Sequence, residues 1–392
     1  MSRDEIPAAL SQLRTGAMAL GVLGVVGLVL SYFMSPEVFF RAYLYGYMFA
    51  LSFPLGCMGL LFLHHLVGGA WGFIIQRILE AGVQSIWLMA VLFVPVALGG
   101  EHLYLWMDQT VVAHDAILQG KTAYLNYGFW LIRAAIYFAI WLGLAALLIR
   151  YSKKQDETGE GVWSNRLNRI SGIGMVIYFL SMTFAAFDWA MSLEPHWFST
   201  IYGLIFVEGQ GLTALAFAIV VLSVARRNAT LGRVATVDRI HDIGKIQFAL
   251  IALWAYLNFS QFLIIWYANL PEEITWYAHR TQGGYEYLAS FLVFGQFLLP
   301  FFLLMTRMTK RRMQTLAGIA IYILVVRLVD LYWLLMPTEH HLELKLHFGH
   351  VAAPLGLFGI WFVVFYWNLS RRSILVEQDP RWKEKLAHDH AH

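Results

Sequence analysis

The sequence predicts an all-α polytopic membrane protein with ten transmembrane helices, because its composition, hydropathy and charge placement all indicate a chain embedded in a bilayer. Hydrophobic residues make up 59% and charged residues 14% of its 392 residues, whereas a soluble domain carries about 25% charged residues. The mean hydropathy is +0.59. We therefore expect residues 1–392 to form a single membrane domain.

Ten apolar runs are long enough to cross a hydrocarbon core about 30 Å thick, which needs roughly 20 helical residues. They cover residues 15–33, 38–63, 85–98, 124–148, 170–191, 201–224, 246–270, 286–305, 316–336 and 351–369. The third run is short because Arg77, Glu80 and Gln84 interrupt its inner end. The single cysteine, Cys57, lies in the second run, so this chain alone cannot build a disulfide, an iron-sulfur cluster or a CxxCH haem site.

Lysine and arginine gather on one side of the predicted membrane. Of the 28 such residues, four lie in outer loops, two lie inside spans and all the others lie in inner segments. The four outer cations are Arg41, Lys121, Arg280 and Lys345. By the positive-inside rule this bias places both termini in the cytoplasm. The net charge of +3 reflects this topology and does not indicate nucleic-acid binding.

The order of the spans predicts two four-helix bundles. Spans two to five (residues 38–191) and six to nine (residues 201–336) are sets of four with the same direction. Such a pattern is typical of a parallel duplication about an axis along the membrane normal. Spans one and ten are then peripheral, and residues 371–392 form a cytoplasmic tail. We also expect a long outer loop with an interfacial helix at 99–123 and a flexible inner loop at 152–168.

Ionisable side chains inside the spans are the strongest functional signal, because a central Asp, Lys or Arg costs about 2.5–3.5 kcal/mol on insertion scales. At a rise of about 1.5 Å per residue, six such groups share the outer half: Arg133, Asp188, Glu208, Glu286, Arg327 and Asp330. Two fixed cations cannot neutralise four carboxyls, so up to two carboxyls should be neutral acids. This excess acidity predicts a proton relay. The alternative is that Arg327 and Asp330, spaced i, i+3, only fix helix packing.

The inner side carries a second polar group. His64 and His65 close span two, and Glu80 lies where span three opens, which predicts the cytoplasmic mouth of a half-channel. The alternative is ordinary interfacial side chains that reach to water. A transmembrane b-type haem needs two histidines on facing helices at one depth. His64 and His65 find no such partner, so we expect no haem and no intrinsic metal.

The most specific stretch is FDWAMSLEPHWFSTIYG, residues 187–203. It ends span five with Asp188, crosses the outer surface in a proline-containing turn and re-enters directly. Glu194 and His196 are expected at the surface opening above Asp188. Such an arrangement can release protons outward, or it can bind a quinol headgroup between Asp188 and His196.

This stretch resembles the signature of the second NrfD/PsrC-like membrane subunit (ActF-type) of alternative complex III, the quinol:electron-acceptor oxidoreductase of bacterial respiratory and photosynthetic electron-transport chains. The resemblance implies a ten-helix subunit of the bacterial cytoplasmic membrane. Its implied partners are a sister NrfD-like quinol-binding subunit, an iron-sulfur protein, c-type cytochromes and small membrane subunits. It further implies that haem c and iron-sulfur clusters sit on those partners, with quinone or menaquinone as the candidate ligand.

Three function classes stay open: a non-redox proton-conducting and scaffolding subunit, a quinone-binding catalytic subunit, and an independent proton-coupled transporter. The first ranks highest, because the chain supplies no electron acceptor and shows no glycine-broken helix pair that marks a transport site. Its predicted pathway comprises Asp188, Glu194, His196, Glu208, Arg133, Arg327, Asp330, Glu286, His64, His65 and Glu80.

Overall fold

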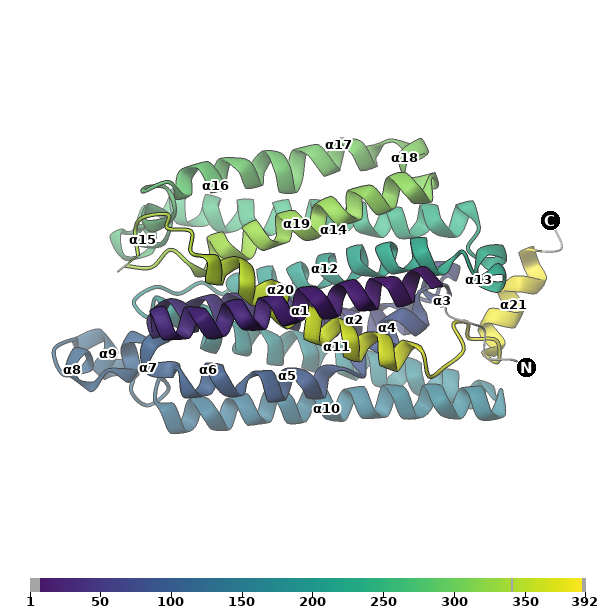
Figure 1. Ribbon diagram of the computed structural model, residues 1–392, viewed down its shortest axis with the longest axis horizontal. Coiled ribbons are helices and arrows are strands. Elements are labelled where there is room, and N and C mark those ends of the chain that lie inside the picture. Colours follow the sequence, from purple (N-terminus) through teal and green to yellow (C-terminus); the bar gives the residue numbers. More distant parts are fainter. Residues whose placement is uncertain (1–7, 340, 390–392) are drawn as a thin grey trace.

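The computed structural model describes residues 8–339 and 341–389. Ten of its helical segments are long and apolar enough to cross a membrane, which confirms the predicted fold class, and they run side by side (Figure 1). They are α1 (Ala8–Met34), α2 (Pro36–Val67), α4 to α6 (Gln76–Leu98), α10 (Tyr127–Thr158), α11 (Gly161–Trp189), α12 (Tyr202–Ala225), α14 (Val237–Ala268), α16 to α17 (Tyr285–Met305), α19 (Met313–Leu335) and α20 (Phe348–Leu369).

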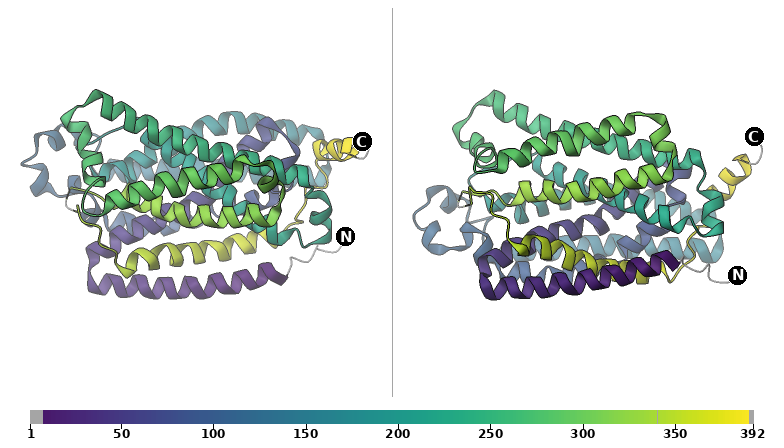
Figure 2. Two further views of the ribbon diagram at one scale, coloured as in Figure 1. Left: turned by 90° about the horizontal axis from the view of Figure 1, so that it is seen from above. Right: turned by 45° about the horizontal axis from the view of Figure 1, so that its top comes forward.

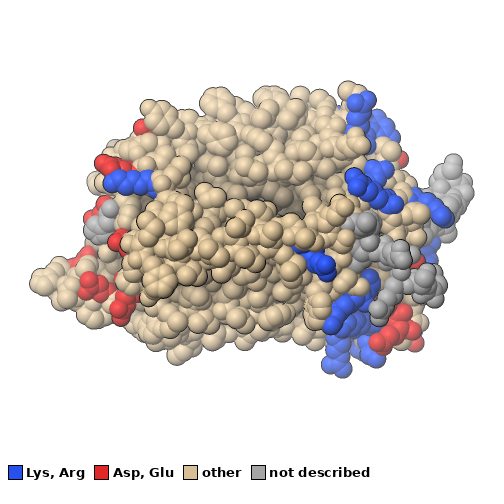
Figure 3. All heavy atoms as spheres, in the orientation of Figure 1, with Lys and Arg blue, Asp and Glu red and all other residues tan. Residues whose placement is uncertain are grey.

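The start of α1 and the C-terminal helix α21 (Pro380–Asp389) lie at the same end of the molecule (Figures 1 and 2). On the face shown in Figure 3, lysines and arginines gather mainly at that end and most acidic residues lie at the opposite end. The positive-inside rule assigns the basic end to the cytoplasm. The apolar band between the two ends is the part that faces lipid.

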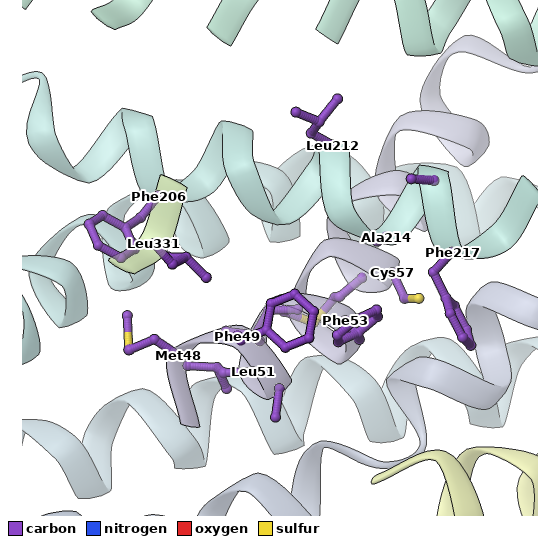
Figure 4. Packing of buried hydrophobic residues seen from close by; sticks show 14 of the residues in the cluster. Met48, Phe49, Leu51, Phe53, Cys57, Phe206, Leu212, Ala214, Phe217 and Leu331 are labelled. Atoms are coloured by element: carbon purple, nitrogen blue, oxygen red, sulfur yellow. The ribbon is translucent and has the colours of Figure 1, made fainter. Parts of the chain in front are cut away.

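Two helices form the centre of the molecule. In α2 and α12, 89% and 83% of the most apolar stretch is buried, more than in any other described span. They approach closely at Gly56, where a Cβ would lie 2.0 Å from the carbonyl oxygen of Gln210. Beside this contact Phe53 packs edge-on against Phe217, with 5.3 Å between ring centroids, as Figure 4 shows. Small residues and aromatic packing therefore hold the two central helices together.

Each central helix belongs to one bundle. α2 packs against α4, α5 (Ile86–Leu92) and α11, and α10 packs on the outside of α11. In the same way, α12 packs against α14 and α19, while the α16 to α17 segment packs on the outside of α14 and α19. The α16 to α17 segment contains a π-helical stretch (Leu292–Leu298), a feature often found at functional sites. Spans two to five and six to nine are thus arranged alike.

The two bundles also share a local feature at their outer ends. Asp188 and Asp330 each precede a proline by seven positions, Pro195 and Pro337. The Lys121 ammonium donates to the Pro195 carbonyl at 2.5 Å, and the Arg280 guanidinium donates to the Pro337 carbonyl at 3.1 Å. Both cations end a helix of an outer loop, α9 (Ala116–Lys121) and α15 (Pro271–Arg280). A duplicated four-helix unit would produce this correspondence.

The first and last spans differ in how enclosed they are. Only 28% of the apolar stretch of α1 is buried, in keeping with the peripheral position expected for it. α20 lies between α1 and α2, so 56% of its stretch is buried, and its Trp361 donates to the Ser85 hydroxyl at 2.7 Å. Glycine permits the contact with α1, since a Cβ at Gly24 would lie 2.2 Å from the Gly356 nitrogen.

The prediction of a flexible loop at 152–168 is wrong. α10 continues to Thr158 and α11 begins at Gly161, with Gly159 in the left-handed conformation (φ 68°) between them. The polar side chains there pack against one another, as when Gln155 donates to Ser164, so both helices extend beyond the apolar core. The structure also shows a helix across Arg77 and Glu80, α4 (Gln76–Val83), because these two charges pair with each other.

The outer loop at 99–123 is helical but is not one helix. It contains α7 (Gly100–Leu103), a 3-10 turn (Leu105–Met107), α8 (Gln109–Val112) and α9. Asp108 and Asp115 break it, because each accepts hydrogen bonds from backbone N–H groups of the next short helix. The remaining short helices are α3 (Ala70–Phe73), a 3-10 turn (Met191–Leu193), α13 (Ala229–Val234), α18 (Arg307–Arg311) and α21 (Pro380–Asp389).

Candidate functional site

Asp188, near the outer end of α11, forms a two-pronged ion pair with Arg133 of α10. The Arg133 Nε and Nη2 atoms lie 2.7 and 2.8 Å from the two carboxylate oxygens of Asp188. The Tyr137 hydroxyl donates a third hydrogen bond at 2.8 Å. Asp188 is fully buried, and the Arg133 guanidinium lies 3.8 Å from the centre of the Tyr124 ring. This acid is therefore fully satisfied within the first bundle.

Glu208 of α12 lies in a different setting. We call Glu208, together with Arg327 and Asp330 of α19, the Glu208 cluster. Arg327 pairs with Asp330, and Trp254 donates to the same Asp330 oxygen at 3.2 Å. The guanidinium lies against Gly209, where a Cβ would be 2.2 Å from Nη2. Glu208 is 5% exposed, and neither of its carboxyl oxygens, nor the second oxygen of Asp330, has a hydrogen-bond partner in the described chain. The arginine of the cluster is thus paired with Asp330, while Glu208 has no hydrogen bond within the described chain.

Glu194 is held at the outer surface by two residues of α15. Its carboxylate oxygens lie 2.5 Å from His279 Nδ1 and 2.6 Å from Arg280 Nη1. Burial alone would raise the pKa of Glu194, but the Arg280 charge and the hydrogen bonds from His279 and Arg280 outweigh burial and hold this pKa below its usual value. Arg280 also donates to the Leu334 carbonyl at 2.9 Å, so this group links the motif to the end of α19.

The structure does not bring Asp188 and His196 together. His196 Nε2 lies 2.5 Å from a carboxylate oxygen of Asp115 in the outer loop, whereas Asp188 faces Arg133. Hydrogen bonds from the Leu118 backbone and from His196 lower the pKa of Asp115. A cavity of about 380 Å³ lies beside the motif, but its lining includes neither Asp188 nor His196.

Glu286 stands apart from the other predicted members of the outer group. It lies in the first turn of α16, where its carboxylate accepts from the Gly284 backbone at 2.8 Å. It is half-buried. Its observed contact stabilises the start of a helix and does not connect it to the Glu208 cluster.

At the inner side, Glu80 is the centre of a network that draws on two spans, α4 and α10, and on the tail. Its carboxylate accepts from Arg77 at 2.6 Å, Arg372 at 2.7 Å and Ser152 at 2.6 Å. Asp156 lies 2.5 Å from each of the same two arginines. Two acids and two cations balance here, so the network closes the inner side without excess charge.

His64 and His65 lie beside this network and are almost completely buried. Both ring nitrogens of His64 and Nδ1 of His65 have no hydrogen-bond partner among residues 8–339 and 341–389. The His64 ring packs edge-on against Phe73, with 4.7 Å between centroids. The packing against α3 separates this pair from the inner aqueous side, and no hydrogen bond of the described chain joins it to Glu80.

Sequence reasoning missed the partners of these groups: Asp115, Asp156, His279, Arg280 and Arg372. All five lie outside the predicted spans and resemble ordinary loop charges. One feature of the sequence could have indicated such contacts: a cation in an outer loop, where cations are rare. Three of the four outer cations donate to backbone carbonyl oxygens: Lys121, Arg280 and also Arg41, whose Nη2 lies 2.6 Å from the Met336 oxygen.

No group of three or more His, Cys, Asp or Glu side chains in the described residues could hold a metal ion. Comparison with known proteins found no family model and no curated protein that matches the chain.

Proposed function

We propose that this chain is the ActF-type membrane subunit of a quinol-oxidising complex of the alternative complex III kind, where it contributes a transmembrane proton pathway and a scaffold. The motif at 187–203 and the ten-span architecture support this proposal. Its redox partners would be a sister NrfD-like subunit, an iron-sulfur protein and c-type cytochromes. These partners would carry the haem c and the clusters.

The Glu208 cluster is the observation that carries the proton-pathway part of the proposal. A buried carboxylate without a hydrogen-bond partner costs several kcal/mol, and such a group lowers this cost by taking up a proton. Arg327 is a permanent cation and is already paired with Asp330. One excess acidic proton can therefore reside on either Glu208 or Asp330 and can leave when the local charge changes.

The outer exit that fits this cluster is Glu194 with His279. The His279 side chain is 18% exposed, and it hydrogen-bonds to Glu194. Arg280 joins Glu194 to the Leu334 carbonyl at the end of α19, the helix that holds Asp330. The inner entry would lie on the side that carries Glu80, His64 and His65, and the contacts of Arg372 and α3 that close this side would have to open. Quinol binding between Asp188 and His196 has weaker support, because each of these residues is engaged by a different partner.

The proton-to-electron ratio of the assembled complex in vesicles tests the pathway. Glu208→Gln removes the ionisable proton and breaks no hydrogen bond that the structure contains. We expect normal assembly, normal quinol oxidation and fewer protons translocated per electron. Glu286→Gln is the matched control and should leave the ratio unchanged. A wild-type ratio in Glu208→Gln at normal turnover would show that the cluster is structural.

Assembly is tested separately by purification from the native membrane. The chain should copurify with multihaem and iron-sulfur proteins, whereas the isolated chain should show no haem absorption. A chain that purifies alone and catalyses proton-coupled uptake of a solute would instead be the independent transporter.

A further inference from the structure

A crevice of about 270 Å³ opens between the two bundles, lined by residues of α2, α11, α12 and α14. Three of its lining side chains reach the outside of the molecule: Phe179 is 39%, Leu204 is 37% and Leu253 is 41% exposed. These residues belong to membrane spans. The crevice is therefore accessible from the lipid.

Glycines provide much of the space. At Gly59 of α2, a Cβ would lie 3.0 Å from the Tyr178 ring. At Gly211 of α12, the nearest atom to a Cβ would be Leu250 Cδ2 at 3.8 Å. A larger side chain at Gly211 would thus extend into the crevice without displacing backbone.

Glu208 is the one acid among otherwise almost wholly apolar lining residues. The other polar side chain, Tyr178, already donates its hydroxyl proton to Gln210 at 2.7 Å. The carboxyl oxygens of Glu208 have no partner in the described part of the chain, and a buried polar group in that state is costly. The two oxygens are themselves buried, so a bound molecule with a hydroxyl group would supply the missing hydrogen bond once the Glu208 side chain turns toward the crevice.

The position of Glu208 indicates how such a molecule would lie. The crevice runs from Leu204 at the outer end to Leu63 at the inner end. Helical rise gives it a length of roughly 20 Å, which exceeds the hydrocarbon thickness of one leaflet. Glu208 lies one turn from Leu204, near the outer end. An amphiphile of the outer leaflet has the same orientation, with its head outward and its chain inward.

The lining also restricts the headgroup. No lysine or arginine lines the crevice, so a phosphate would have no counter-charge there and would face an acidic residue. We propose that the crevice binds one neutral membrane lipid with a hydroxyl head, of the long-chain alcohol or monoacylglycerol class. Its hydroxyl bonds to Glu208 and its chain lies along the glycines and leucines.

Photolabelling of the full chain in nanodiscs tests this site. The probe is hexadecanol with a diazirine in its chain, and labelled peptides are identified by mass spectrometry. We expect labels on the α2, α12 and α14 segments that line the crevice. Gly211→Leu should abolish them, whereas Gly143→Leu should not, because a Cβ at Gly143 meets nothing within 4 Å.

Glu208→Leu tests the hydrogen bond to the lipid headgroup separately from the binding of the lipid chain. It should weaken labelling about three- to tenfold, the value of one hydrogen bond. Undiminished labelling in Gly211→Leu would overturn the site. Equal labelling by a phosphatidylcholine probe, unaffected by Glu208→Leu, would overturn the proposal that the bound lipid has a hydroxyl headgroup. Because labelling needs no turnover, it can succeed even if the proton-to-electron ratio of Glu208→Gln proves normal.

Discussion

Individual buried charges in this protein differ in the number of partners they have. Asp188 has a two-pronged arginine and a tyrosine hydroxyl, whereas Glu208 has no hydrogen-bond donor within the described residues. A satisfied pair resists any change of charge, since removing one member exposes the other. Proton transfer is therefore more easily assigned to Glu208 than to Asp188.

The Arg133–Asp188 pair should behave as a structural unit. Arg133→Leu leaves a buried carboxylate without its cation, a defect of about 3–5 kcal/mol, and should lower the thermal unfolding midpoint in detergent. The double variant Arg133→Leu/Asp188→Leu removes both charges and should recover most of the loss. A double variant as unstable as the single one would contradict this interpretation.

The ion pairs of Glu194 should make stability depend on acid pH. Its pKa is lower in the folded protein than its usual value of about 4.3. The stabilisation is therefore fully present above about pH 4.3 and is lost as the pH falls towards the lower folded value. Unfolding midpoints across acidic pH should show a steeper loss in the wild type than in Glu194→Gln. Parallel curves would show that other groups dominate.

Among the elements, the C-terminal segment (residues 371–389) acts as a strap across the inner side. Arg372 joins the network of Glu80, and Trp382 is 2% exposed, with its ring 5.3 Å from that of Phe73. Phe73 in turn packs on His64. The strap therefore covers the side from which the buried histidines would be reached.

Loss of one aromatic anchor should loosen this strap. Trp382→Ala removes packing worth about 3–5 kcal/mol in a core, so amide hydrogen exchange in α21 should accelerate and spread to α3. Glu384→Ala changes an exposed position of the same helix and should leave exchange unchanged. If the two variants exchange alike, the strap is held by Arg372 and not by Trp382.

At the scale of the whole molecule, two similar bundles meet at α2 and α12, and on the face shown in Figure 3 the cations gather mainly at one end. The crevice and Glu208 lie where the bundles meet. A duplicated unit explains why both halves end in Asp-x6-Pro and why a cation from each outer loop binds that proline carbonyl.

The orientation can be tested with cysteine labelling in intact cells. Cys57 is fully buried and should not react, so single substitutions suffice. A membrane-impermeant maleimide should label Gln109→Cys directly, and Glu157→Cys only after permeabilisation. Labelling of both without permeabilisation would contradict the proposed sidedness.

The sequence alone determined the ten spans and the presence of buried charge, and it predicts the sidedness, because hydropathy and cation placement are properties of each segment by itself. It did not determine which charges meet. Arg133 finds Asp188 through the rotation of α10 against α11, and Glu194 finds Arg280 through an outer helix that no hydropathy pattern indicates. The helical course of residues 152–168 likewise depends on polar side chains of two neighbouring helices that satisfy each other. Pairing depends on tertiary contacts, because a buried charge is stabilised only by the group that packing places within hydrogen-bond reach.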